Sequence, residues 1–189
     1  SSLMCGANRL LSLAPLVKTP PKCFMFDCES LPTGEIQWAL DIWARDFRLS
    51  TYANSVKVLL AARKGDIDQL RSLSFAHNGH RYLVIPTFAQ WAEAKALCER
   101  FGGHLATITD KETNDFLSTF FPFGGSWFWI GLEVTEAGPR WITGEPFGYS
   151  AFLNDRHATE KGPKVYSCKH WVHDVVPGAC NCFMIEWDS

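Results

Sequence analysis

The most informative stretch of this 189-residue chain is WAEAKALCERFGGHLATI, which occupies residues 91–108. Apolar side chains recur every three or four residues from Trp91 to Phe101, so the first half predicts a helix with one apolar face. The glycine pair at 102–103 ends that helix, because glycine adopts the left-handed conformation of a C-terminal cap without steric cost. Residues 104–108, which follow the pair, are strand-like.

The sequence on either side of this stretch extends the pattern. Residues 80–85 read as a strand, and residues 127–132 read as an aromatic-rich strand that enters the core. A capping box, in which Ser or Thr is followed three residues later by Glu or Gln, occurs at Thr87 and again at Thr109. Each box predicts the start of a helix, which gives the order strand, helix, strand, helix, strand.

Composition divides the chain near residue 75. Residues 1–75 contain no histidine and two of the eight tryptophans, whereas residues 76–189 contain all six histidines and eleven of the fourteen glycines. We expect an N-terminal arm and helical extension over 1–75, with helices beginning near Thr33, Ser50 and Asp66, and a separate turn-rich domain over 76–189. The extension is interpreted either as a docking or oligomerisation stalk or as a helical layer that completes the core.

Together and in this order, these features resemble the C-type lectin-like domain. The residues that carry the resemblance are 91–98, 102–108, Glu112, the WIGL of 129–132, Trp141 with Gly144, and the closing FMIEW of 183–187. The resemblance covers about residues 78–189. It implies an α+β fold of C-type lectin-like type, in which two helices flank antiparallel sheets and a long loop leaves the fold at about residues 147–176. Trp91, Trp129, Trp141 and Trp187 are expected in the core.

The long loop departs from the family's calcium pattern. Members that bind sugar through calcium usually carry Glu-Pro-Asn or Gln-Pro-Asp in this loop and Trp-Asn-Asp further on. Here the loop reads FLNDRH at 152–157, and the later stretch reads WVHD at 171–174, with histidine in the asparagine position. Calcium requires six to eight oxygen ligands, and histidine supplies none. We therefore expect no calcium-dependent sugar binding and no cofactor.

The resemblance instead implies a non-enzymatic domain that recognises a protein or glycan surface through the long loop. The predicted contacting residues are Asn154, Asp155, Arg156, His157, Trp171, His173 and Asp174, with Trp171 as the exposed tryptophan. Loops held on a rigid scaffold commonly carry binding residues. The alternative interpretation is a structural or interaction module of a larger parent protein.

Cysteine and histidine residues crowd the end of the same region. Cys168, His170, His173, Cys180 and Cys182 offer ligands that zinc accepts in tetrahedral sites, so a zinc site is an alternative prediction. Disulfides compete with it, because by the resemblance Cys168 would pair with Cys180 or Cys182. Cys23 and Cys28 are separate disulfide candidates that would close a small ring in the N-terminal arm. Both alternatives stay open.

Cys98 has a separate expectation. Family members often join this helix cysteine to one just before the final glutamate, but Ile185 occupies that position here. Because Cys98 lies on the apolar face of its helix, it is predicted to be a buried thiol outside any disulfide. The total of seven cysteines also leaves at least one thiol unpaired in a monomer.

Composition narrows the class of partner. The net charge of −2 argues against nucleic acid, which requires a basic face, and no run approaches the ~18 apolar residues that span a bilayer. The chain has no Gly-x-Ser-x-Gly, phosphate-binding glycine loop, dinucleotide fingerprint or His-Glu-x-x-His, so no enzyme class is indicated. The resemblance favours an extracellular, periplasmic or cell-surface location, with the cytoplasm as the alternative.

Overall fold

A computed structural model of the chain describes residues 50–120, 127–167, 170–173 and 181–188. The strands are β1 (Phe75–His77), β2 (His80–Ala89), β3 (His104–Leu105), β4 (Phe128–Thr135), β5 (Gly138–Trp141), β6 (Gly162–Ser167), β7 (His170–His173) and β8 (Asn181–Asp188). The helices are α2 (Ser50–Lys64), α3 (Ile67–Leu73), α4 (Trp91–Arg100), α5 (Lys111–Leu117) and α6 (Asp155–Thr159), with a 3₁₀ turn at Ser118–Phe120. The mixture of helices and sheet confirms the α+β prediction.

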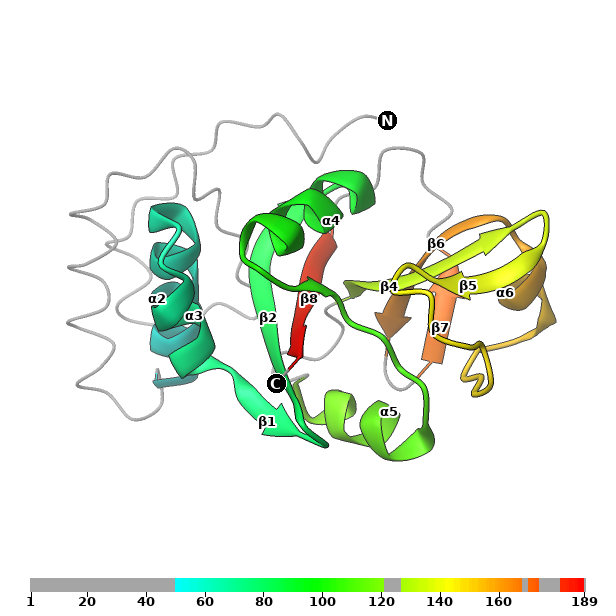
Figure 1. The fold of residues 1–189 in the computed structure, drawn as a ribbon, viewed down its shortest axis with the longest axis horizontal. Helices are drawn as coiled ribbons and strands as arrows, with labels where there is room; N and C mark the ends of the chain where they lie inside the picture. The colour runs from blue at the N-terminus through cyan, green and yellow to red at the C-terminus, as the bar shows by residue number, and fades with distance from the viewer. Residues whose placement is uncertain (1–49, 121–126, 168–169, 174–180, 189) are drawn as a thin grey trace, which may run out of the picture.

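The strands form one sheet in the order β1-β2-β8-β4-β6-β7, with β3 beside β8 and β5 beside β4. Helices α2 and α3 lie to one side of β2 and β8, whereas β4 to β7 and α6 lie to the other (Figure 1). Within the described ranges, no helix combines the length and the apolar composition needed to cross a membrane.

Strands β2 and β8 are antiparallel neighbours, and their register fixes which side chains meet. His80 pairs with Asp188, Tyr82 with Glu186 and Ile85 with Phe183 across the two strands. The first residue of β2 therefore lies beside the last residue of β8, although more than one hundred positions separate them in the sequence. This register brings polar residues from both ends of the domain to one edge.

The hairpin between β1 and β2 sets the start of that register. Asn78 and Gly79 both have positive φ, 48° and 82°, and they connect the paired residues His77 and His80. Two-residue connections with positive φ match the twist of antiparallel strands, and Asn-Gly adopts them at little cost. The turn therefore holds His80 at the beginning of β2.

Helix starts agree with the sequence at Ser50 and Asp66 and differ at two positions, and the start expected near Thr33 lies outside the described residues. Asp66 caps α3 as expected, because its carboxylate accepts the Gln69 backbone N–H. The prediction for Thr87 is wrong: Thr87 lies within β2, and α4 begins only at Trp91. The prediction for Thr109 is displaced by one residue, because Asp110 provides the cap of α5 and accepts the Thr113 backbone N–H at 2.7 Å.

Two glycines of the quoted stretch have different roles. Gly102 has φ of 73°, so it supplies the left-handed end of α4 that the sequence predicts. Gly103 provides space instead, because a Cβ atom there would lie 2.3 Å from the Glu186 carbonyl oxygen. The second glycine therefore allows the chain to run close against β8, where β3 pairs with it.

Two clusters of buried residues form the core. The first joins α2, α3 and α4 to β2 and β8, and its members include Ala61, Leu70, Leu83, Cys98 and Trp187. The helical-layer interpretation agrees with this cluster, because the described helices before residue 75 share it with the rest of the fold. The division of the chain at residue 75 remains a prediction, and residues 1–49 lie outside the described part.

The second cluster lies between the sheet and the long loop. Its members include Phe128, Ile130, Trp141, Tyr166 and Trp171. Of the four tryptophans predicted as core, Trp129, Trp141 and Trp187 are buried, and Trp91 is partly buried. The indole N–H groups of Trp91, Trp129 and Trp187 each donate to a backbone carbonyl oxygen. Two of these bonds fix the two ends of α4 to the sheet, and the third joins β4 to the end of β2.

Candidate functional site

The long loop is fixed to the sheet by an aromatic cluster around Trp171. The rings of Phe147, Tyr149 and Phe152 meet the Trp171 ring edge-on, with centroids 6.2, 5.6 and 5.4 Å away. The Trp171 backbone N–H donates to the Ala151 carbonyl oxygen at 2.8 Å, which ties the loop to β7. The loop base is therefore packed like a core.

This packing overturns one prediction. Trp171 was expected to be exposed for ligand contact, but its relative exposure is 0%. Its indole Nε1–H donates to the Asn114 side-chain oxygen at 3.2 Å. The loop aromatic residues cover the ring from one side, so Trp171 supports the loop and cannot touch a ligand directly.

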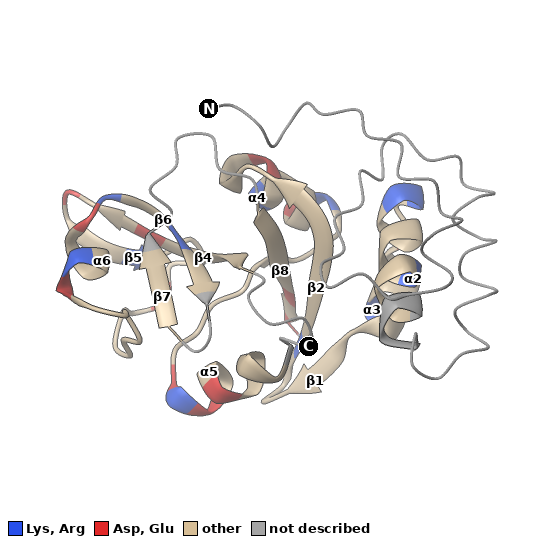
Figure 2. Ribbon diagram, turned by 180° about the vertical axis from the view of Figure 1, so that it is seen from behind, with Lys and Arg blue, Asp and Glu red and all other residues tan. Residues whose placement is uncertain are grey.

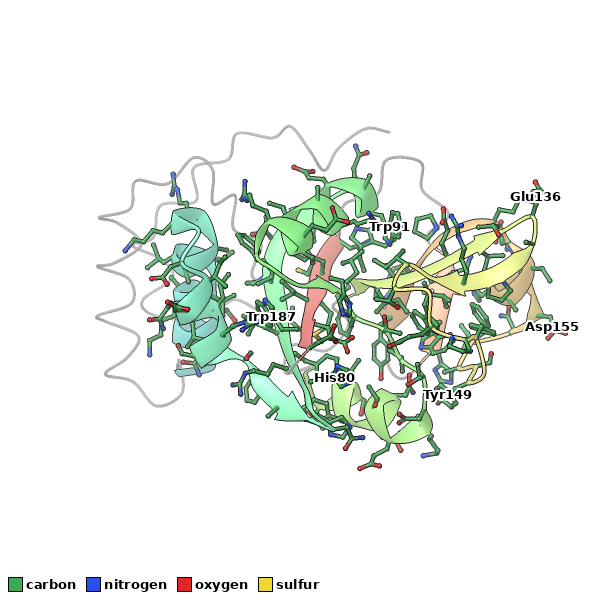
Figure 3. The ribbon with its side chains drawn as sticks, in the orientation of Figure 1. His80, Trp91, Glu136, Tyr149, Asp155 and Trp187 are labelled. Atoms are coloured by element: carbon green, nitrogen blue, oxygen red, sulfur yellow. The ribbon has the colours of Figure 1, made fainter. Side chains whose placement is uncertain are left out.

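The loop is also shorter than the sequence implies. The expected excursion over residues 147–176 contains β6 and β7, so the segment that leaves the sheet ends before Gly162. A short helix, α6, forms its outer part, with Asn154 as the cap accepting from the His157 backbone N–H. Figure 3 shows Asp155 at the outer edge of the domain.

The residues 153–157 that begin this part are called the loop crest below. Asn154, Asp155 and Arg156 are exposed, His157 is half-buried, and the Leu153 side chain is 51% exposed. Four of the seven predicted contact residues thus lie together, with Trp171 beneath them. His173 belongs to β7, but its side chain and all of Asp174 lie outside the described residues.

Charges around the loop crest are paired locally. The Arg156 Nε lies 3.3 Å from a Glu160 carboxylate oxygen, and Lys161 pairs with Glu136. Figure 2 shows acidic and basic residues interspersed over α6 and the neighbouring strands. Exposed pairs of this kind contribute little to stability, so these side chains are available to a partner at small cost.

One charged residue near the crest is buried. The Lys164 ammonium donates to the Glu160 carbonyl oxygen at the end of α6. Burial lowers the pKa of Lys164 to about 8, although the nearby Glu160 carboxylate favours the charged form. Lys164 therefore fixes the inner end of α6 at an electrostatic cost.

The acids in the described part of the loop are not gathered around a common point. Glu145 and Asp155 are exposed, and Glu160 pairs with Arg156. Among the described residues, no group of three carboxylate, histidine or cysteine ligands converges in this loop. A calcium ion needs six to eight oxygen atoms around it, and this part of the loop does not gather them.

The cysteine predictions have mixed outcomes. Cys98 is buried and outside any disulfide, which confirms the prediction, and burial raises the pKa of its thiol. The zinc and disulfide alternatives involve Cys23, Cys28, Cys168 and Cys180, all of which lie outside the described residues. His170 is exposed at the start of β7 and Cys182 is half-buried in β8, so neither alternative is tested.

A second polar group, which the sequence analysis missed, lies at the end of β8. The buried Glu186 carboxylate accepts the Thr107 backbone N–H at 2.7 Å and the Tyr82 hydroxyl at 3.1 Å. The His80 Nδ1 lies 2.9 Å from the same carboxylate and 3.1 Å from the Asp188 carboxylate. Burial raises the pKa of Glu186, although both backbone and histidine neighbours oppose that shift.

Two signals in the sequence indicate this group in retrospect. Asn78-Gly79 marks a hairpin that places His80 at the start of a strand. Glu186 and Asp188 are two positions apart on the closing strand, so their side chains share one face. What the sequence lacks is the register that sets the two strands opposite each other.

Comparison with known proteins supports the fold. Residues 88–181 match the family model described as the lectin C-type domain. The chain is 34% identical over 70 residues to C-type lectin domain family 4 member F of Mus musculus. The aligned segment covers 37% of this chain and 13% of that protein. This chain therefore corresponds to a small part of that relative's length.

Solved structures also have the C-type lectin-like fold. The cow C-type carbohydrate-recognition domain of CD23, in the presence of a GlcNAc2Man3 oligosaccharide, has a TM-score of 0.52 and 22% identity over 61% of this chain and 93% of its own. The Ca2+-independent C-type lectin SPL-2 of Saxidomus purpuratus has a TM-score of 0.54 and 23% identity over 61% and 91%. At these identities the matches establish the fold alone.

Proposed function

We propose, from the premise that this chain carries a C-type lectin-like domain, that it acts as a non-enzymatic recognition module. It binds a protein or glycan surface through the loop crest, residues 153–157, and it does so without calcium. The observation that carries the proposal is the contrast within the loop, in which a packed aromatic base around Trp171 holds an exposed polar crest. A rigid base reduces the entropy lost when the crest meets a partner.

The chemistry of the crest suits a polar surface. Asn154, Asp155, Arg156 and His157 offer both hydrogen-bond donors and acceptors, and exposed Leu153 adds apolar contact beside them. Interfaces of this composition form a polar rim around a small apolar centre. Each of these side chains is within a few positions of the next, so one partner surface would touch them together.

Independence from calcium is supported by the placement of the loop acids. Glu145, Asp155 and Glu160 do not converge in the described loop, and Asn154 is engaged as the cap of α6. The SPL-2 lectin, whose fold this chain shares, is itself described as Ca2+-independent. The proposal also places the protein outside the cytoplasm or at a cell surface, as is general for this family.

The test is binding of the fluorescent chain to an array of glycans and glycoproteins, measured in calcium and again in EDTA. We expect the same spots to bind under both conditions. Arg156→Ala should weaken that binding at least fivefold. The control is Lys95→Ala, because Lys95 also forms an i,i+4 pair, with Glu99 on α4, whereas Arg156 pairs with Glu160 at the end of α6.

Three outcomes would overturn the proposal. Binding that disappears in EDTA would show calcium-dependent recognition. Equal effects of Arg156→Ala and Lys95→Ala would remove the loop crest from the interface. Binding to no array feature and to no cell surface would favour the alternative of a structural module within a larger parent protein.

A further inference from the structure

The polar group at the end of β8 has the composition of a metal site. One ligand atom each from His80, Glu186 and Asp188 lies within 4.8 Å of the other two. Figure 3 shows His80 near the C-terminal end of β8, well away from Asp155 on the loop crest. The β2–β8 register produces this convergence, because it pairs His80 with Asp188 directly.

We propose that His80 Nδ1, Glu186 Oε1 and Asp188 Oδ1 bind a zinc ion. Imidazole nitrogen and carboxylate oxygen are ligands that zinc accepts, and tetrahedral bonds of ~2.0–2.2 Å place neighbouring ligand atoms about 3.3 Å apart. The Nδ1 atom lies 2.9 Å from Glu186 Oε1 and 3.1 Å from Asp188 Oδ1, close to that spacing. Small outward shifts of the exposed side chains admit the ion.

His104 completes the set. Its Nδ1 lies 3.0 Å from the Leu105 carbonyl oxygen, a contact that requires the proton on Nδ1 and leaves the lone pair on Nε2. Nε2 lies 3.5 Å from Asp188 Oδ1, so the Nε2 lone pair of the neutral ring is within reach of a cation held by Asp188. With zinc bound to Asp188, His104 Nε2 becomes the fourth ligand after a small adjustment of the Asp188 side chain.

The surroundings hold the buried ligand in place. The Tyr82 hydroxyl and the Thr107 backbone N–H each donate to Glu186, which fixes the orientation of its carboxylate. Outer hydrogen bonds of this kind raise metal affinity by about 10–100-fold. The Leu105 carbonyl oxygen likewise orients the His104 ring by accepting the Nδ1–H.

Access from solvent is open on the other side. The side chains of His80 and Asp188 are 36% and 70% exposed, whereas Glu186 is buried. A zinc ion therefore enters from the surface and meets one fixed ligand and two adjustable ones. This site is separate from the loop crest, and it stands whether or not the crest binds a partner.

The test is zinc titration of the whole chain after removal of metal with EDTA and dialysis, followed by calorimetry and by thermal unfolding. We expect about one zinc per chain and a higher Tm in its presence. His80→Gln and Asp188→Asn, both at exposed positions, should each weaken zinc binding at least tenfold. The matched control is His170→Gln, which removes an exposed histidine on β7 and should leave the affinity unchanged.

Cobalt distinguishes this site from the cysteines of residues 168–182. Nitrogen and oxygen ligation gives Co2+ visible d–d bands without the near-ultraviolet charge-transfer band that a thiolate produces. A thiolate band with wild-type affinity in His80→Gln would overturn the proposal, as would less than about 0.2 zinc per chain. Unchanged affinity in both His80→Gln and Asp188→Asn would show that the group is only a set of ion pairs.

Discussion

The two polar regions of the molecule differ in how their side chains are held. On the loop crest, the Asn154 side chain accepts the His157 backbone N–H and Arg156 pairs with Glu160, so these two polar side chains have partners three and four positions away. At the end of β8, Glu186 receives hydrogen bonds from Tyr82 and Thr107, which are 104 and 79 positions away. The first arrangement is made by a short helix, and the second exists only once the sheet has formed.

Because of this difference, we expect changes around Glu186 to alter stability and changes on the loop crest to alter recognition. Distant partners around a buried carboxylate must form together with the core, so a change there alters the free energy of unfolding. Local pairs on an exposed helix contribute little to that free energy and are open to a partner. Substitutions in one region at a time separate the two effects, and Trp171 packs beneath the crest.

Trp171→Ala should have the largest effect. Removing a fully buried indole costs about 3–5 kcal/mol of unfolding free energy, and here it also removes the ring against which Tyr149 and Phe152 pack. Urea unfolding measures the loss. Limited proteolysis should then cut within residues 142–161 well before it cuts β2 or β8.

The control for this change is Trp171→Phe. Phenylalanine retains an aromatic ring under the loop but loses the hydrogen bond to Asn114. The loss should be smaller, and the loop should stay resistant to protease. Equal protease resistance in Trp171→Ala would show that the aromatic base does not hold the crest.

Glu186→Gln should have the next largest effect. The amide keeps one acceptor for the Thr107 N–H, but its NH2 group replaces an acceptor that faces both the Tyr82 hydroxyl and His80. We expect a loss of about 1–3 kcal/mol in urea unfolding with EDTA present. Asp188→Asn, at an exposed position, should change stability by less than about 0.5 kcal/mol. Equal losses in the two variants would contradict the assignment of Glu186 as the fixed member.

Lys164→Met should raise stability at neutral pH. The pKa of Lys164 is lowered from its ordinary 10.5 to about 8, so at pH 7 the folded state holds a buried charge that burial disfavours. Lys164→Met also loses the hydrogen bond to the Glu160 carbonyl oxygen, which offsets part of this benefit, so we expect a net gain of about 1 kcal/mol over wild type. Between pH 8 and 10.5 the unfolded state binds more protons than the folded state, so wild type gains stability over this interval. The difference in unfolding free energy between Lys164→Met and wild type therefore decreases.

Unfolding of both proteins at pH 7, 9 and 10.5 measures this gap. The control is Lys161→Met, because Lys161 is exposed and paired with Glu136. The difference in unfolding free energy between Lys161→Met and wild type should be small, and it should not decrease between pH 7 and 10.5 as the difference for Lys164→Met does. A gap for Lys164→Met that stays constant from pH 7 to 10.5 would contradict the argument.

Local signals in the sequence predicted local structure well. The cap at Asp66, the left-handed Gly102 and the buried thiol of Cys98 are all confirmed, because each depends on the residue and its own helix. The ordered set of motifs also led to the fold. The Thr87 prediction is wrong because pairing with β8 extends β2 beyond the point where a capping box would act.

Residues that depend on distant pairing were harder to predict. Trp171 lies among polar residues in the sequence, and only the packing of the loop against β7 shows that it is buried. His80 and Glu186 meet through a register that no single segment encodes. The crest residues Asn154 and Asp155 could be selected because exposure of a polar helix is itself a local property.

Arg156→Ala should have a small effect on stability, below about 1 kcal/mol, because the Arg156 side chain is 71% exposed, although its partner Glu160 is only 34% exposed. Its effect on recognition should nevertheless be larger than that of Glu186→Gln measured on the folded protein. Binding to the array feature found with wild type measures the effect on recognition, and urea unfolding measures the effect on stability. The comparison between the two regions fails if Arg156→Ala unfolds the domain or if Glu186→Gln, while folded, abolishes binding. Loss of binding with full stability in Arg156→Ala alone would establish that recognition lies in the locally held crest and not in the buried group.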